Sequence, residues 1–173
     1  MYYEMLRNRR SRRVFSDREV EDEKLDIILK SALLSPSSKS KRPWEFVSVR
    51  DGETLKKLAL CKPHGATPIA GAKLALVVLA DPGISDVWIE DASIAAILIQ
   101  LAAESQGLGS CWIQIRQRFR DEEVSAEEHV RKALKIPENY CVECIIAIGY
   151  PAESKEPYDE STLPYEKIHR ERF

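Results

Sequence analysis

The sequence predicts an α+β or α/β fold in a single domain. Segments with the apolar spacing of amphipathic helices alternate along the chain with short apolar runs typical of buried strands. One helical segment, about Glu90 to Gln106, has no polar side chain between Ser93 and Gln100, so we expect it to be buried nearly all round. No repeat or Pro/Gly-rich linker divides the 173 residues, a length typical of one domain.

The predicted helices share apolar residues at helical spacing or recognisable caps, and they cover Tyr2 to about Asn8, Leu25 to Leu33, Glu53 to Leu60, Glu90 to Gln106 and Ser125 to about Leu134. Pro36 and Gly107 stop the second and fourth of them, and Ser125 and Glu128 form a capping box. The predicted strands are Trp44 to Val49, Leu74 to Ala80, Gly109 to Ile115 and Cys141 to Ile148. The tail 150–173 has too few apolar anchors for a core of its own, so we expect it to be mobile or to wrap another surface.

Composition and charge exclude several classes of partner. A formal net charge of −2 gives no general attraction to nucleic acid or to an anionic membrane. The longest uncharged apolar run, Ala92 to Ala103, is too short to cross a bilayer, and the N-terminus does not read as a secretory signal. We therefore expect a cytoplasmic protein without membrane or nucleic-acid partners.

The four cysteines are expected to be reduced thiols, because they lack the spacing of a disulfide framework. Cys141 and Cys144 form a C-x-x-C pattern, but they lie within a predicted strand, where side chains three positions apart face opposite sides. The histidines are scattered and provide no second ligand pair for zinc. We expect no metal site.

Two polar segments near the N-terminus indicate a site for a phosphorylated, planar ligand. The arginine segment, Arg9 to Phe15, places four guanidinium groups around one hydroxyl, and arginine offers planar pairs of donors to a phosphate. The serine loop, Ser35 to Pro43, has small side chains and a rigid Pro-Trp exit, which let a flat ligand approach the backbone. Each segment also has a purely structural interpretation, as a solvated helix end or as a polar connection.

Four motifs, in this order, resemble the FMN-dependent nitroreductase family in its short-chain form: Arg9-Arg10-Ser11-x-Arg13-x-Phe15, Pro36-Ser37-Ser38-x-x-x-Arg42-Pro43-Trp44, Ala102 to Ile113, and Ile148-Gly149-Tyr150-Pro151. The resemblance extends from Met5 to Phe173 and implies one FMN-binding domain over residues 1–173. It implies a three-layer α+β fold: a mostly antiparallel central sheet flanked by helices around a buried central helix. It also implies an intertwined homodimer with an FMN at each end of the interface, and a tail that wraps the partner subunit.

The resemblance also implies roles for individual residues. Arg9 and Ser11 match positions that hold the FMN phosphate, and Lys155 matches a further basic residue that binds this phosphate. Arg13 matches the cation beside the pyrimidine edge of the flavin. Pro36, Ser37 and Ser38 match a stretch that reaches the flavin from the partner. The remaining members of the predicted FMN-binding set are Arg10, Ser40, Arg42, and, in a loop whose backbone faces the central flavin ring, Gln114, Ile115, Arg116 and Gln117.

This chain departs from the family pattern at two places. Many members carry Asn and Gln in the serine loop where this chain has Ser40 and Arg42, and the basic residue expected shortly after Lys155 is replaced by Glu156-Pro157-Tyr158. The implied activity is ping-pong electron transfer from NAD(P)H to nitro compounds, quinones or related small acceptors. Because the flavin performs the hydride chemistry itself, no catalytic side chain is predicted. The alternative is a protein that binds or stores FMN without efficient turnover.

Overall fold

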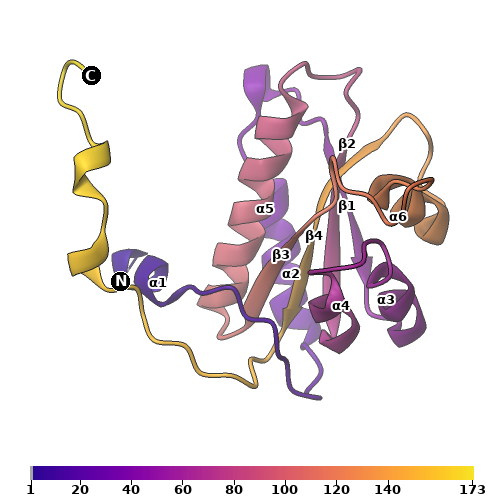
Figure 1. The fold of residues 1–173 in the computed structure, drawn as a ribbon, viewed down its shortest axis with the longest axis horizontal. Helices are drawn as coiled ribbons and strands as arrows, with labels where there is room; N and C mark the ends of the chain where they lie inside the picture. Colours follow the sequence, from indigo (N-terminus) through magenta and orange to yellow (C-terminus); the bar gives the residue numbers. More distant parts are fainter. Residues whose placement is uncertain (1) are drawn as a thin grey trace.

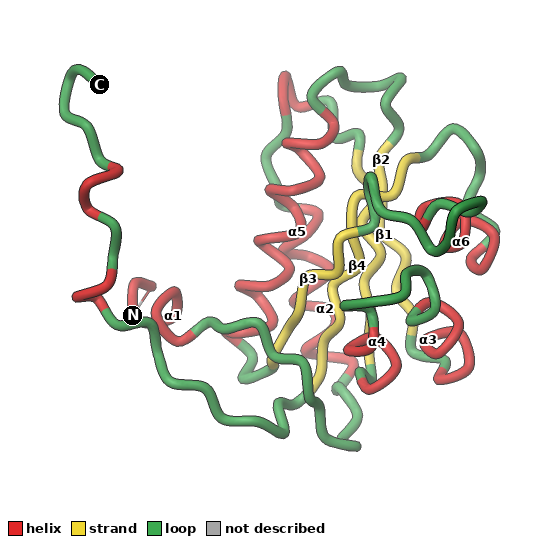
Figure 2. The backbone as a smooth tube through the Cα atoms, in the orientation of Figure 1, coloured by secondary structure: helices red, strands yellow, loops and turns green. Residues whose placement is uncertain are grey.

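A four-stranded sheet with helices on both faces forms the three layers of the molecule (Figures 1 and 2). The structure is a computed structural model that describes residues 2–173. The strands are β1 (Trp44–Val49), β2 (Leu74–Ala80), β3 (Gly109–Gln114) and β4 (Cys141–Gly149). They lie in the order β1-β2-β4-β3, and every neighbouring pair is antiparallel, so β1 and β3 are the edge strands. This confirms the three-layer α+β fold.

Helices α2 (Asp22–Leu33) and α5 (Trp88–Ser105) cover one face of the sheet, and α3 (Gly52–Leu58), α4 (Thr67–Gly71) and α6 (Ala126–Leu134) cover the other. Every residue of the central strand β2 is buried. Its side chains alternate between the two layers, since Leu76 packs with the α2 and α5 cluster and Val77 with the α3, α4 and α6 cluster. Burial on both faces explains why β2 reads as a continuous apolar run.

The element boundaries follow the sequence predictions closely, including α1 (Tyr2–Asn8) and the Ser125 cap, whose hydroxyl accepts the Glu128 N–H at 3.0 Å. The sequence analysis missed α4 and three short 3₁₀ turns: η1 (Ser38–Ser40), η2 (Glu160–Thr162) and η3 (Tyr165–Lys167). Helices this short carry too few turns for an apolar period to be recognised. All four cysteines are free thiols, as predicted.

One expectation about α5 is wrong for the single chain. The helix is not buried on nearly all sides, because Ile94 is 40% and Ile97 38% exposed. Its buried side chains, such as Ala96 and Ile99, face the sheet and α2, and no element within residues 2–173 covers Ile94 and Ile97. This 18-residue helix therefore has an exposed apolar stripe that includes Ile94 and Ile97, and exposed apolar stripes of this kind are typical of protein–protein interfaces.

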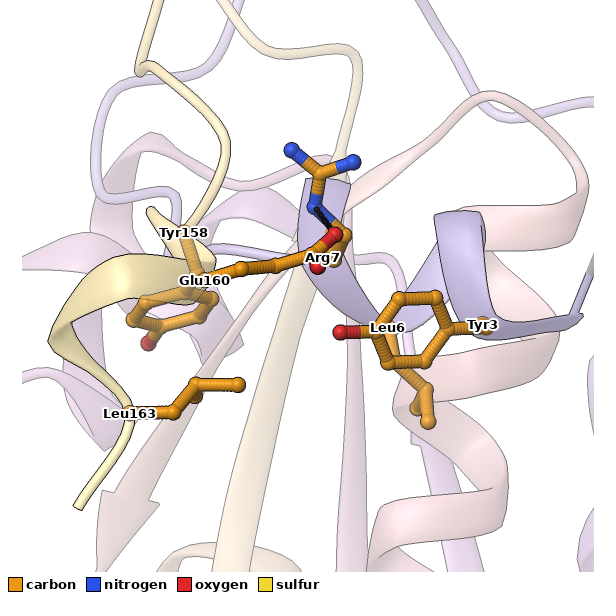
Figure 3. Close-up of a pocket in the computed structure, with 6 residues that line it drawn as sticks. All are labelled: Tyr3, Leu6, Arg7, Tyr158, Glu160 and Leu163. Atoms are coloured by element: carbon orange, nitrogen blue, oxygen red, sulfur yellow. Dashed lines mark ion pairs between the residues drawn. The ribbon is translucent and has the colours of Figure 1, made fainter. Parts of the chain in front are cut away.

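The C-terminal tail leaves the sheet and runs beside α1, away from the body of the domain (Figure 1). The Tyr158 N–H donates to the Arg7 carbonyl at 2.9 Å, and Arg7 Nε lies 3.2 Å from Glu160 Oε1 (Figure 3). Together with Tyr3, Leu6 and Leu163 these residues line a small hollow between α1 and the tail. Farther along, Tyr165 and Ile168 are exposed, so the tail covers little of its own domain.

Candidate functional site

The arginine segment is seated across the adjoining ends of β3 and β4. The Arg12 N–H donates to the Ser110 carbonyl at 2.9 Å, and the Ser16 N–H donates to the Tyr150 carbonyl at 2.8 Å. Two glycines, paired with each other in the β3–β4 register, allow this approach. A Cβ atom on Gly109 would lie 2.7 Å from Arg12 Cγ, and one on Gly149 would lie 3.1 Å from the Phe15 ring. The glycines therefore position the arginine segment.

A polar hollow of about 190 Å³ lies beside this seat, lined by Arg10, Ser11, Arg13, Lys155 and Tyr158. Lys155 Nζ donates to the Ser11 carbonyl at 2.6 Å and lies 3.4 Å from Glu153. The side chains that line it carry two guanidinium groups, an ammonium and two hydroxyls, a donor set that suits a phosphate. We call it the polar hollow.

The two arginines of the hollow differ in their partners. Arg10 donates to the Glu156 carbonyl, and its guanidinium lies 4.5 Å from the centroid of the Tyr158 ring. Arg13 makes its hydrogen bond through the backbone: its N–H donates to Glu153 Oε1 at 2.6 Å. Within residues 2–173 the Arg13 guanidinium has no hydrogen-bond or ion-pair partner, so it is free to meet an anionic ligand.

Arg9, predicted to hold a phosphate, does not line the polar hollow. It lies with Arg12 near Glu104 of α5, where burial raises the pKa of that carboxyl and the two arginines partly offset the rise. Since α1 ends at Asn8, the chain direction changes at Arg9 and turns its neighbour Arg10 into the hollow instead. Motif matching cannot resolve which of two adjacent arginines points which way.

The free edge of β3 leads away from the polar hollow. The Ile115 N–H donates to the Glu143 carbonyl of β4 at 3.2 Å. The backbone N–H and C=O groups of odd-numbered residues in β3 therefore bond to β4, and those of even-numbered residues point away from β4, toward the free edge. At one end of this edge the Ser110 carbonyl accepts the Arg12 N–H of the arginine segment. At the other end Lys62 Nζ donates to the Gln114 carbonyl at 3.0 Å. Cations thus flank both ends of an open strand edge.

Most polar groups of residues 114–116 are already engaged. Gln114 Oε1 accepts from Trp112 Nε1 at 2.8 Å, and Gln114 Nε2 donates to the Arg116 carbonyl at 3.2 Å. The Ile115 side chain is fully buried, and the Arg116 N–H donates to the Glu143 carbonyl at 3.1 Å. Within the described residues the Gln117 N–H has no acceptor, and Gln117 has a φ of 55°. Two backbone donors of this loop in the described chain therefore stay available for the predicted role: the Gln117 N–H and the Gln114 N–H, which faces the free edge of β3.

Arg116 leaves the loop in another direction. Its guanidinium lies 6.0 Å from the centroid of the Trp88 ring, at the N-terminal end of α5. This contact connects the end of β3 with the first turn of α5.

Glu143 is a buried carboxyl directly behind this loop. It is 4% exposed and lies at the irregularity in the β2–β4 register, where Val78 pairs with Cys144 but Leu79 pairs with Val142. Gln114 Nε2 lies 3.4 Å from Glu143 Oε1, and Oε2 has no hydrogen-bond partner within residues 2–173. Burial raises the pKa of Glu143, while Gln114 and Arg116 lower it in part and Glu127 adds to the rise.

Replacing Glu143 with glutamine is expected to remove a pH-dependent loss of stability. Below the unfolded-state pKa of about 4.3, the carboxyl is protonated in both states, so wild type has its full stability there. Because the folded pKa is raised, stability falls as the pH rises through it, by about 1.4 kcal/mol for each unit of the shift. Urea denaturation at pH 4, below the unfolded-state pKa, and at pH 9 measures this loss. A Glu143→Gln variant that loses as much stability as wild type over this range would contradict it.

The serine loop is attached to the N-terminal end of α5, and the arginine segment lies near the C-terminal end of the same helix. The Ser38 N–H donates to Oδ1 of the buried Asp91 at 2.8 Å, and Oδ2 of the same carboxylate accepts the Ser85 hydroxyl at 3.1 Å. Within the loop, Ser37 Oγ accepts the Arg42 N–H at 2.8 Å. Pro36, Ser40 and the Arg42 side chain are exposed at the surface. Asp91 therefore fixes the loop to the first turns of α5.

The structure brings together only part of the predicted site. Asp91 and Glu104 mark the two ends of α5 to which the serine loop and the arginine segment are attached, and at 1.5 Å per residue they are about 20 Å apart. One chain thus gathers Arg10, Ser11, Arg13 and Lys155, but it leaves Pro36, Ser37, Ser38, Ser40 and Arg42 at the far end of the helix (Figure 1).

Three residues near the site carry no recognisable signal in the sequence: Lys62, Glu143 and Tyr158. Each reaches the site from a segment distant in sequence, so only the tertiary fold reveals it. Among residues 2–173 no group of His, Cys, Asp or Glu side chains is arranged to hold a metal ion. None of the helices that the structure describes is long and apolar enough to cross a membrane.

Comparison with known proteins agrees with the fold. The model of the family described as "Nitroreductase family" matches residues 6–79 and 59–150. The chain belongs to the nitroreductase family. This confirms the resemblance found in the sequence and places the protein in a family of oxidoreductases.

Several family members cover almost the whole chain. An FMN-dependent nitroreductase from Clostridium difficile R20291 is 52% identical, with a TM-score of 0.98 and coverage of 99% of both chains. A protein from Archaeoglobus fulgidus named "Putative NADH dehydrogenase/NAD(P)H nitroreductase" is 40% identical over 98% of this chain and 97% of its own length. A protein of the same name from Methanothermobacter thermautotrophicus is 36% identical over 98% of this chain and 86% of its own.

Proposed function

We propose that this protein is an FMN-dependent oxidoreductase that transfers electrons from NAD(P)H to a small acceptor, such as a nitro compound or a quinone, by a ping-pong mechanism. The observation that carries the proposal is the polar hollow at the end of the free edge of β3. It gathers Arg10, Ser11, Arg13 and Lys155 in a chain that is 52% identical to an FMN-dependent nitroreductase.

The residues present fit the phosphate of FMN. The hollow offers two guanidinium groups and an ammonium, with Glu153 as the nearby carboxylate, so a dianion would find a net positive surrounding. The Arg13 guanidinium has no partner of its own within residues 2–173. The glycine pair at 109 and 149 keeps the arginine segment close to the sheet and leaves the hollow open.

When bound, FMN would supply the hydride chemistry. The protein's residues contribute position and charge. Arg13 and Lys155 bring cations to one end of the β3 edge, where they favour an anionic ligand, and Lys62 does so at the other end. The Gln114 side chain, held by Trp112 and Glu143, fixes the turn at Gln117 so that its free N–H keeps one direction. No acid–base pair of side chains is needed for this activity.

We further propose that the working unit is a homodimer in which the serine loop of one subunit completes the site of the other. Two observations support this: the apolar stripe of α5 that includes Ile94 and Ile97 is open, and the two halves of the site lie about 20 Å apart in one chain. A two-fold axis perpendicular to α5 would pack two copies of the helix antiparallel and so pair each arginine segment with a partner's serine loop.

The experiment is to purify the protein, identify the flavin released on denaturation, and mix the yellow protein anaerobically with NADH or NADPH. We expect rapid bleaching of the flavin absorbance and its recovery when a nitro compound or quinone is added. A protein that binds FMN but is bleached by neither nucleotide would be a holder of FMN rather than an enzyme. A colourless protein that fails to bind added FMN would contradict the proposal altogether.

A further inference from the structure

We propose that a second hollow, lined by Lys62 and Arg120, binds the adenosine monophosphate half of the NAD(P)H donor. This inference rests on the proposed function and assigns a place to the part of the donor that does not react. It depends on three features of residues 59–67 and 118–121: the shape of the hollow, its charge, and its connection to the free edge of β3.

The hollow lies between the loop that joins α3 to α4 and the loop that follows β3. It has a volume of about 340 Å³ and is lined by Ala59, Leu60, Lys62, Pro63, Ala66, Thr67, Arg120 and Asp121. Its lining includes apolar side chains, among them Leu60, which is 62% exposed, and two cationic ones, Lys62 and Arg120. Apolar side chains together with cationic groups suit an adenosine that carries phosphates.

The positive charge in this region is incompletely neutralised. No carboxylate lies within ion-pair distance of Lys62 or Arg118 in the part of the chain that the structure describes. Arg120 Nε lies 3.7 Å from Asp121 Oδ2, but Oδ1 of that carboxylate already accepts the Val124 and Glu123 N–H groups. Burial lowers the pKa of Lys62, and the neighbouring Arg118 lowers it further. An anion bound here would relieve the repulsion between these cations.

Lys62 connects the hollow with the proposed flavin site. Its Nζ donates to the Gln114 carbonyl at 3.0 Å, on the free edge of β3, while the same side chain forms part of the lining of the hollow. A dinucleotide with its nicotinamide over this edge would therefore have a cationic recess within reach of its diphosphate. The polar hollow near Arg10 is taken by the FMN phosphate in the proposed function, which leaves this recess for the donor.

The experiment compares NADH and NADPH with reduced nicotinamide mononucleotide, which lacks the adenosine monophosphate half. In Arg120→Gln we expect the KM for NADH and NADPH to rise about tenfold with kcat unchanged, the loss of one charge-assisted contact. Lys62→Met should raise these KM values by the same factor and also change kcat, because Lys62 contacts the β3 edge of the proposed flavin site. The KM for the mononucleotide should stay at its wild-type value. ADP-ribose should compete with NADH in wild type and compete about tenfold more weakly in both variants.

Two variants are needed because Lys62 also contacts Gln114, whereas Arg120 does not touch β3. The matched control is Lys56→Met, which removes the same charge from an exposed lysine of α3 that pairs with Glu53 at 2.9 Å. Its KM values should equal those of wild type. Equal changes for the dinucleotides and the mononucleotide, or no change in either variant, would overturn the inference while leaving the proposed function intact. Flavin reduction by none of the three donors would overturn both.

Discussion

Ile97→Asp is expected to abolish the dimer and, with it, FMN binding. Ile97 is 38% exposed in the single chain and lies with Ile94 on the open stripe of α5. In a dimer packed along this stripe, the substitution would bury an unpaired carboxylate, which costs about 3 kcal/mol or more and weakens association at least a hundredfold. Because the serine loop of the same chain lies at the far end of α5, a monomer would retain only half of the site.

Light scattering and the flavin content of the purified variant measure this effect. The control is Phe119→Asp, which places the same charge at an apolar side chain that is 64% exposed on the side of the sheet covered by α6. The control should remain a yellow dimer. A folded Ile97→Asp monomer that retains FMN as tightly as wild type would contradict the shared site.

The second large effect is expected at Arg10. Arg10→Ala should weaken FMN binding about ten- to a hundredfold, since a charge-assisted contact to a phosphate contributes roughly 1.5–3 kcal/mol. Arg9→Ala removes the same charge from the adjacent residue, which lies near Glu104 and outside the polar hollow. It should change the dissociation constant of FMN less than threefold, roughly the effect of a screened surface charge.

Arg13→Gln completes this comparison. The Arg13 guanidinium lines the polar hollow, and the family resemblance matches it to the cation beside the pyrimidine edge of the flavin, where negative charge develops on reduction. We expect the variant to keep oxidised FMN within about tenfold of wild type but to lower its reduction potential, the signature of a contact that strengthens on reduction. Dissociation constants and a redox titration of all three variants decide the matter. FMN loss in Arg9→Ala as large as in Arg10→Ala would show that the polar hollow is not the phosphate site.

The sequence predicted the strands and the longer helices well because their signals are local, whereas the three-layer arrangement came from the family resemblance. The fully buried β2 is a continuous apolar run, and a capping box opens α6. The burial of α5 was wrong for a physical reason: an apolar helix in the sequence does not show whether its own chain or a partner covers each side. The sequence contains no information on which chain supplies that cover.

The candidate site was predicted less completely than the fold. The motifs predicted the arginine segment, the serine loop and Lys155 as parts of one FMN site. The structure places Arg10 and Lys155 in the polar hollow and Arg9 outside it, and the FMN contacts of these residues stay predictions. Likewise, the loop after β3 was located by resemblance. That the Gln114 and Gln117 N–H groups are its unbonded donors in the described chain follows only from the bonds that Ile115 and Arg116 make to Glu143.

A test of the shared site by complementation between subunits addresses the central claim most directly. One chain carries Arg10→Ala with Arg13→Gln, and the other carries Ser38→Trp, which fills the serine loop. Each variant alone should form a dimer with little FMN. When the two are co-expressed with different tags and the mixed dimer is isolated, one of its sites has both lesions and the other has neither. The account predicts about half the wild-type FMN content in the mixed dimer, bleached by NAD(P)H at the wild-type rate, and a mixed dimer as empty as its parents would contradict it.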